Sequence, residues 1–375
     1  MNNLQGQVQS EIDRLVESGT ERGIQVAAYH RGELVVEAVS GVADPATGRK
    51  VTADTPFYNY SVGKAAASTI AHMFVERGLF GYDTAVMEVW PEFGAHGKEK
   101  VTVRHVLSHT AGVPGIPLDT TIEDLCDWDK MCAAIADEEL WWEPGTKIGY
   151  HAYTFGYIVG EIVRRAIGKR ISQVLLEEVS GPLGVANELY FGMPLGEQHR
   201  LAKLEDAPMD PAAMAAMSSM PPDLPMFKAA PMSLMPTANL GNREDILAAD
   251  IPAGGKMSAR AIARMYAALL GEVDGVRLIS PKTLKEATAV AMSGPDAVFG
   301  MPTTWGLGYA IGGLGSPSDP QNATTFGVGG AGGSFACGNT ATGIAVAVTK
   351  NMLTQDFSTS SKLIDLVTAA LAPVR

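Results

Sequence analysis

A serine and a lysine three residues apart, Ser61 and Lys64, are the side chains whose types and spacing best suit chemistry. If they open a helix, positions i and i+3 share one face, so the lysine amine can reach the serine hydroxyl. A buried lysine that has lost its proton can take the serine proton, which turns a weak alcohol into a nucleophile for acyl groups. The tetrad therefore predicts a serine nucleophile with a lysine base, although so short a pattern also recurs by chance.

The surrounding sequence indicates where this tetrad lies. Residues 55–60 are aromatic, contain a proline and are typical of extended chain, whereas residues 64–77 are rich in helix formers. Gly78 follows where a helix often ends on a glycine. We therefore expect Ser61 at a helix N-terminus, where free N–H groups and the helix dipole favour negative charge. The alternative is that Ser61 only caps the helix.

Two further segments offer the partners that such a serine needs. The turn-rich run 141–152 leads to Tyr150, which would accept a proton as a phenolate if Lys64 lowered its pKa from the usual value of about 10. The alternative is a buried structural tyrosine. The run 329–333 holds four glycines around Ala331, which indicates that its backbone approaches another group closely.

That close neighbour is expected to be a substrate acyl group. The backbone N–H groups of Ser61 and Ala331 would then form an oxyanion hole. A flexible glycine linker and a phosphate-binding loop are the alternatives, and the missing Walker lysine disfavours the phosphate loop.

Composition excludes several classes of function. The chain has 375 residues, 46% of them hydrophobic, and a net charge of −12, which disfavours a nucleic-acid partner. No apolar run approaches the roughly 20 residues of a membrane span, so no membrane partner is expected. The three cysteines lack zinc spacing and the histidines are mostly scattered along the chain, so neither a metal nor another cofactor is expected. Oligomeric state has no signal in the sequence.

Location follows from two weaker signals. The first residues lack the basic start and apolar stretch of a signal peptide. The cysteines Cys126, Cys132 and Cys337 form an odd set and are expected to be buried, reduced thiols. Both signals predict a cytoplasmic protein.

The distribution of periodic segments predicts an α+β fold. Helices are expected over residues 4–18 and 359–371, and a hairpin turn at Arg31-Gly32. Strands are expected over residues 24–30, 33–38, 305–312, 324–328, 334–337 and 344–349. Strands near both ends imply one antiparallel sheet, flanked by helices, with a mostly helical lobe inserted. The predicted domains are an α/β sheet domain of residues 1–60 and 295–375, and a helical domain of residues 61–294.

One segment of the helical domain is unusual. Residues 208–236 hold seven prolines and seven methionines. Proline prevents a long helix, and methionine suits surfaces that adapt to varied apolar ligands. The segment is either a meandering loop whose methionines fill gaps in the core, or a lid over an acyl-binding pocket.

Several motifs in order resemble one known family. Ser61-Val62-Gly63-Lys64 matches its S-x-x-K tetrad, and residues 103–112 resemble its L-L-S-H-T-A-G stretch. Glu143–Thr146 with Tyr150-His151-Ala152 resembles its P-G turn and tyrosine motif, and residues 305–309 and 329–333 resemble its late strands. Over roughly residues 20–370 the chain is similar to the serine β-lactamase-like group. That group includes class C β-lactamases, penicillin-binding protein-like D-aminopeptidases, esterases and transacylases.

This resemblance implies roles for the motif residues. Ser61 would be the nucleophile and Lys64 its base, and Tyr150 would pass the proton to the leaving group and then activate the acceptor. The intermediate would be an acyl-Ser61 enzyme. The fold would be the β-lactamase/transpeptidase-like sandwich. The other motif positions, His151, Trp305 and Val328 to Gly330, would bind substrate. The alternative role for His151 is to tune Tyr150.

Two departures from the lactamase motifs indicate the substrate. Ala152 stands where Y-x-N has an amide, and Val328 stands where K-T-G has a cation for the drug's carboxylate. Neither side chain can form these bonds, and an anion buried beside valine would be costly. The expected donor is therefore a neutral or apolar carboxylic ester.

The expected activity is an esterase or a transacylase. The acceptor would be water, an alcohol or an amine, and the choice depends on pocket shape and water exclusion. The alternatives are an amide hydrolase, either a D-aminopeptidase or a weak β-lactamase, and a non-catalytic binding homologue.

Overall fold

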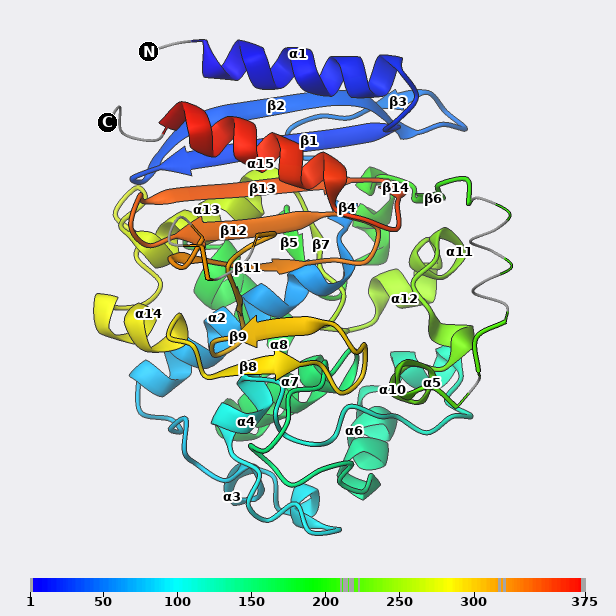
Figure 1. Cartoon of the computed structure of the whole chain (residues 1–375), viewed down its shortest axis with the longest axis vertical. Coiled ribbons are helices and arrows are strands. Elements are labelled where there is room, and N and C mark those ends of the chain that lie inside the picture. The colour runs from blue at the N-terminus through cyan, green and yellow to red at the C-terminus, as the bar shows by residue number, and fades with distance from the viewer. Residues whose placement is uncertain are drawn as a thin grey trace.

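The protein has a sheet-containing region and a mainly helical region. The computed structural model describes residues 3–209, 211, 215, 219–221, 223–315, 318–319 and 322–371. Figure 1 shows the sheet near one end of the molecule with both termini beside it, and helices occupying the other end. None of the helices in the described ranges is both long enough and apolar enough to cross a bilayer.

The central sheet has nine strands in the order β3-β2-β1-β13-β12-β11-β10-β9-β8. Their bounds are β1 Gly23–His30, β2 Glu33–Asp44, β3 Arg49–Lys50, β8 Met292–Pro295, β9 Pro302–Trp305, β10 Ala310–Ile311, β11 Thr325–Gly329, β12 Phe335–Asn339 and β13 Ile344–Lys350. Two small sheets contain β4 Phe57–Tyr58, β7 Lys256–Met257 and β5 Leu189–Tyr190, and β14 Met352–Leu353 with β6 Glu205–Asp206.

The sheet joins the two ends of the chain. β1 pairs antiparallel with β13, and Val26 lies opposite Val348. This confirms the predicted antiparallel sheet built from both termini. The predicted hairpin turn is also confirmed, because Arg31 and Gly32 connect β1 to β2 with φ angles of 53° and 87°. Positive φ at both central residues matches the twist of the flanking strands.

α-Helices lie on both faces of this sheet and also fill the other end of the molecule. They are α1 Leu4–Glu17, α2 Gly63–Glu76, α3 Val86–Val89, α4 Val103–Leu107, α5 Ile122–Cys126, α6 Trp128–Asp137, α7 Thr154–Ile167, α8 Ile171–Val174, α10 Pro225–Ala229, α11 Ala238–Gly241, α12 Glu244–Ala248, α13 Ala259–Leu270, α14 Pro281–Ala287 and α15 Ser358–Leu371. The terminal helices α1 and α15 pack on one face, where Val8, Ile12 and Leu363 share a core with Val26 and Val348. The four-residue spacing of Val8 and Ile12 places both on the buried stripe.

The opposite face of the sheet meets α13 and the helical region behind it. α13 contacts β1, β12 and β13, although it belongs to residues 61–294. The predicted division into two domains at residues 60 and 294 stays a prediction. The packing of α13 nevertheless shows that the middle of the chain contributes directly to covering the sheet.

One predicted strand was wrong. Residues 305–312 form not one strand but the end of β9, a turn, and the short β10. The turn forms because Gly308 has a φ of 84° and its N–H donates to the carbonyl of Leu107. A Cβ at Gly308 would lie 2.2 Å from the Ser68 hydroxyl, so the turn packs directly on α2. The glycines that resembled strand ends instead permit this close approach.

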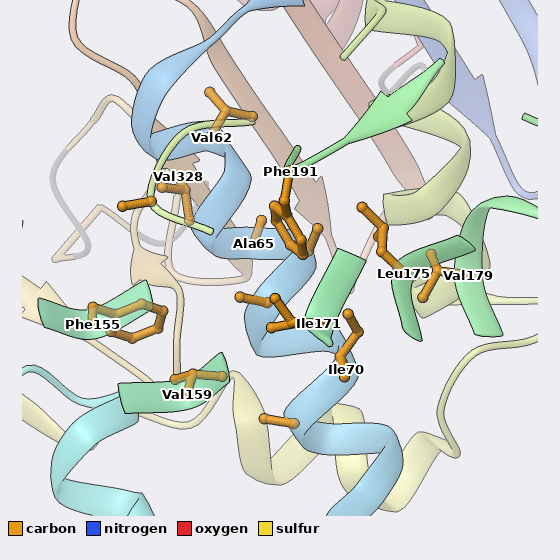
Figure 2. Close-up of a cluster of buried hydrophobic side chains, with 14 of the residues drawn as sticks. Val62, Ala65, Ile70, Phe155, Val159, Ile171, Leu175, Val179, Phe191 and Val328 are labelled. Carbon is orange, nitrogen blue, oxygen red and sulfur yellow. The ribbon is translucent and has the colours of Figure 1, made fainter. Parts of the chain in front are cut away.

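Helix α2 lies inside the molecule. Every residue from Gly63 to Phe74 is buried. Figure 2 shows its side chains Ala65 and Ile70, with Val62 just before the helix, among buried residues from several other elements. A helix enclosed on all sides holds the residues at its start in a fixed position. The predicted end is confirmed as well, since Gly78 follows the C-cap with a φ of 74°.

Candidate active site

Ser61 lies where a single 3-10 turn, Tyr60–Val62, leads into α2. The prediction that Ser61 stands at a helix N-terminus is therefore confirmed. The capping positions are Asn59 for the turn and Val62 for α2, so Ser61 is not the N-cap. Its half-buried hydroxyl remains available for other contacts.

The residue before Ser61 has an unusual backbone. Tyr60 has a φ of 44°, which is rare for a bulky residue and costs on the order of 1–3 kcal/mol. Tertiary contacts hold it: its hydroxyl donates to the Thr237 carbonyl at 2.6 Å, and its ring stacks on Tyr58 at 4.4 Å. The N–H of Gly255 donates to the Tyr60 carbonyl at 3.1 Å. Distant segments therefore fix the direction in which Ser61 points.

Lys64 contacts the Ser61 hydroxyl directly. Its Nζ donates to the Ser61 Oγ at 2.8 Å, and its side chain is 1% exposed. Burial lowers the pKa of Lys64 to about 7, because the charged form loses its hydration. A lysine with this pKa is largely neutral at slightly alkaline pH and can then accept a proton.

Tyr150 completes the group around the Ser61 hydroxyl. Its own hydroxyl forms a hydrogen bond with Ser61, and its ring centroid lies 4.9 Å from Nζ of Lys64. Aromatic neighbours hold the ring, with centroids 4.7 Å away at His109 and 5.9 Å away at Trp305. Three side chains from two distant segments thus meet at one oxygen.

The protonation state of Tyr150 differs from the sequence expectation. We expected Lys64 to lower the pKa of the phenol. Burial, the largest cause, and the charge of Asp296 together raise this pKa to about 12, against the lowering effect of the Ser61 hydrogen bond. The phenolate expectation was therefore wrong, because a phenol removed from water favours its neutral form. Lys64 is the group that is neutral and basic near pH 7 to 8.

Sequence reasoning missed Asp296, which anchors this tyrosine. The carboxylate is buried, and its Oδ2 accepts the N–H of Tyr150 at 3.0 Å. Its Oδ1 accepts the N–H groups of Val298 at 2.8 Å and Phe299 at 2.9 Å. The sequence held only a local signal for this residue, because an aspartate followed four residues later by a glycine indicates a turn. In the structure Gly300 has a φ of 75°. Nothing in the sequence showed that this turn meets Tyr150.

The glycine-rich run follows β11 and approaches the segment before Ser61. A Cβ at Gly330 would lie 1.9 Å from the carbonyl oxygen of Asn59, so this glycine permits backbone-to-backbone contact. The predicted close approach exists, and at Gly330 the neighbour is the protein itself. Ala331 follows as an exposed residue, where a backbone N–H directed to an acyl oxygen stays a prediction.

The predicted substrate-binding side chains lie deeper than expected. Both His151 nitrogens have backbone partners, because Nε2 accepts the Val113 N–H at 3.1 Å and Nδ1 donates to the Gly149 carbonyl at 2.6 Å. Val328 is 1% exposed and lies in the cluster of Figure 2. Trp305 is also buried, against Tyr150. These side chains shape the site from behind, and their direct contact with substrate stays a prediction.

The described part of the segment rich in proline and methionine contacts residues near the site. Residues 210, 212–214, 216–218 and 222 lie outside the described residues, so its prediction as a lid is only partly addressed. Its described part is tied down, because the Tyr153 hydroxyl donates to the Leu234 carbonyl at 2.5 Å. Ala229 and Met226 pack with Trp142 and Val298 in a small apolar cluster.

The side chains around Ser61 are of types suited to acyl chemistry. Among the residues that the structure describes, no group of three His, Cys, Asp or Glu side chains is arranged to hold a metal ion. The arrangement around Ser61 combines a serine hydroxyl, a buried amine and a phenol.

Comparison with known proteins identifies the family of this chain. The family model described as Beta-lactamase matches residues 8–369. The chain belongs to this family. Among curated proteins, the Esterase/beta-lactamase LipL of Mycobacterium tuberculosis is 32% identical over 346 residues, which cover 88% of this chain and 77% of that protein.

Solved structures of the β-lactamase family have the same fold. A family VIII carboxylesterase is 33% identical with a TM-score of 0.86, and the match covers 98% of this chain and 97% of the other. A penicillin-binding protein homologue from Caulobacter crescentus is 31% identical with a TM-score of 0.83, covering 98% of both chains. The predicted α+β fold with a large antiparallel sheet is thereby confirmed.

Proposed function

We propose that this β-lactamase-family protein is a serine hydrolase that cleaves neutral or apolar carboxylic esters through an acyl-Ser61 intermediate. The observation that carries the proposal is the 2.8 Å hydrogen bond between Nζ of the buried Lys64 and Oγ of Ser61. An amine with a pKa near 7, held against a serine hydroxyl, is an activating base.

Acylation follows from these positions. Ser61 Oγ attacks the ester carbonyl carbon while Lys64 Nζ takes its proton, giving a tetrahedral oxyanion. The N–H groups of Ser61 and Ala331 would stabilise that oxyanion, an interaction typically worth about 3–4 kcal/mol. When the carbon–oxygen bond to the alcohol breaks, the departing oxygen takes the proton of the neutral Tyr150 phenol, and Lys64 restores the proton to Tyr150.

Deacylation repeats the same steps with a new nucleophile. Water attacks the acyl carbon, and its proton passes through Tyr150 and Lys64 back to the Ser61 oxygen. An alcohol or amine in place of water would make the reaction a transacylation. Water is the acceptor that we propose, since it needs no dedicated binding site.

Two relatives support an ester substrate. One solved relative is named a carboxylesterase, and one curated relative is named Esterase/beta-lactamase. The second name raises β-lactam hydrolysis as a further candidate. Ala152 and the buried Val328 disfavour it, because neither supplies the amide or the cation that the lactam motifs carry.

The cytoplasmic location is proposed on chemical grounds. Cys126, Cys132 and Cys337 are all unpaired, and burial raises the pKa of each thiol. Three unreactive reduced thiols suit a reducing compartment.

Labelling and turnover test the proposed function together. A fluorophosphonate probe should label the wild-type protein and leave Ser61→Ala unlabelled, and mass spectrometry after mixing with an ester should find the acyl group on Ser61. Aryl esters should turn over faster than a chromogenic cephalosporin. Equal labelling of both proteins, or faster cephalosporin hydrolysis, would contradict the proposal.

A further inference from the structure

The turn between β8 and β9 borders the side of Tyr150. Its residues 296–301 carry two large apolar side chains that solvent reaches, Phe299 at 45% exposure and Met301 at 69%. The Phe299 ring centroid lies 5.9 Å from that of Tyr150. An aromatic ring that is packed on one side and open on the other offers a surface to a ligand.

One buried carboxylate ties the backbone of Phe299 to the backbone of Tyr150. Asp296 accepts the Tyr150 N–H through Oδ2 and the N–H groups of Val298 and Phe299 through Oδ1. The N–H of Ala297 also donates to the Ile148 carbonyl at 2.8 Å, which joins the two loops a second time. The Phe299 backbone and Tyr150 therefore keep a constant spacing.

The proposed chemistry decides which part of the substrate meets this ring. Tyr150 gives its proton to the departing alcohol oxygen, so that oxygen must lie against the Tyr150 hydroxyl when its bond to the acyl carbon breaks. The acyl carbon stays on Ser61, and the carbon skeleton of the alcohol extends from the departing oxygen towards the neighbours of Tyr150. Phe299 is an exposed apolar residue, and its ring packs near the ring of Tyr150.

We propose that the β8–β9 turn forms the alcohol subsite of the esterase, with Phe299 as its specificity-determining residue for apolar, ring-bearing alcohols. This inference rests on the proposed function. The only charged side chain in residues 296–301 is Asp296, whose oxygens are already bonded to backbone N–H groups. The subsite therefore favours neutral alcohols over anionic ones.

Two substrate series test the subsite with Phe299→Ala. Benzyl and ethyl butyrate vary the alcohol, whereas ethyl butyrate and ethyl acetate vary the acyl group. The ratio of kcat/KM for benzyl over ethyl butyrate should fall about 10-fold or more, since an apolar pocket contact is worth 10–200-fold. The butyrate-to-acetate ratio should change less than about 2-fold, because the acyl group lies on the Ser61 side.

Matched variants separate the subsite from general damage. Phe299→Tyr keeps the ring and should retain the wild-type alcohol ratio. Leu195→Ala removes another exposed apolar side chain, 69% exposed, which borders a cavity that does not include Ser61, and should change neither ratio. The deacylation rate of a common butyryl enzyme should be unchanged in Phe299→Ala, because the alcohol has already left.

The outcomes are distinguishable. If the alcohol ratio is unchanged in Phe299→Ala, or if both ratios change equally, the alcohol subsite is wrong. Ester turnover by the wild-type protein would in that case still support the proposed function. Absence of turnover and of acyl-Ser61 in the wild-type protein overturns both. A selective loss of benzyl preference, restored in Phe299→Tyr, supports the inference.

Discussion

The Nζ of Lys64 donates a 2.8 Å hydrogen bond to the Oγ of Ser61 from a position that is 1% exposed to solvent. The helical spacing brings the Lys64 amine close to the Ser61 hydroxyl, and burial lowers the pKa of that amine. A solvent-exposed lysine would stay protonated at neutral pH and could only donate to the serine. At this site the same side chain exchanges its proton near pH 7.

Acylation should therefore depend on pH through Lys64. Burial lowers the pKa of Lys64 to about 7, so the fraction of neutral amine, and with it kcat/KM, should rise from pH 6 to 8 and then level off. Lys64→Arg should lose roughly 10²–10⁴-fold in kcat/KM at every pH, because a guanidinium does not deprotonate. Stopped-flow acylation with an activated ester measures both. A flat profile between pH 5 and 9 would exclude Lys64 as the base.

The same lysine should reduce stability below its unfolded-state pKa. The folded protein releases the Lys64 proton at about pH 7 and the unfolded chain near 10.5, so stability rises with pH between these values. Lys64→Met should be more stable than wild type at pH 7 by up to a few kcal/mol, an advantage that shrinks towards pH 10.5. Urea unfolding at several pH values measures this. A constant difference across that range would contradict it.

Removing the Tyr150 hydroxyl should impair acylation without unfolding the protein. Tyr150→Phe keeps the ring packing against His109 and Trp305 but removes the proton donor to the leaving group. We expect kcat/KM for alkyl esters to fall by roughly 10²–10⁴, and less for esters whose alcohol is acidic and needs no proton. Since burial raises the pKa of Tyr150 to about 12, the wild-type profile should show no loss of activity from its ionisation below pH 11. Equal losses on both kinds of ester would contradict the donor role.

The Asp296 carboxylate should position Tyr150 and keep it protonated. Asp296→Asn cannot accept all three backbone N–H groups, so we expect a stability loss of about 1–3 kcal/mol and a lower kcat. Its negative charge raises the pKa of Tyr150, so the asparagine variant should ionise this phenol at lower pH. The shift is measured from the tyrosinate absorbance of the Asp296→Asn variant as a function of pH. The double variant with Asp296→Asn and Tyr150→Phe gives the absorbance of the other tyrosines for subtraction. An unchanged phenol pKa would leave Asp296 with a purely structural role.

A methyl group at Gly330 should disturb the site through the backbone. The added Cβ would lie 1.9 Å from the Asn59 oxygen, so the segment leading to Ser61 must move. Gly330→Ala should cost about 1–3 kcal/mol in stability and reduce acylation strongly. Gly196→Ala is the matched control, because nothing lies within 4 Å of its added Cβ. Equal behaviour of the two variants would contradict the close approach.

The sequence by itself determined the local features of this protein. The i to i+3 spacing of Ser61 and Lys64, the helix that follows, and Gly78 at its end all depend on interactions within a few residues, and all appear as expected. The hairpin at Arg31-Gly32 is equally local. The order of motifs was enough to predict the β-lactamase-like fold.

The tertiary structure decided what the local pattern left open. The protonation state of Tyr150 depends on its desolvation and on the charge of Asp296, 146 residues away along the chain. The sequence predicted a close backbone approach at residues 329–333, but only the structure shows that the neighbour of Gly330 is Asn59. Gly308 resembled a strand-end glycine, whereas it packs against α2. Burial and long-range contacts set these properties, because a pKa and a backbone approach depend on everything that surrounds a group.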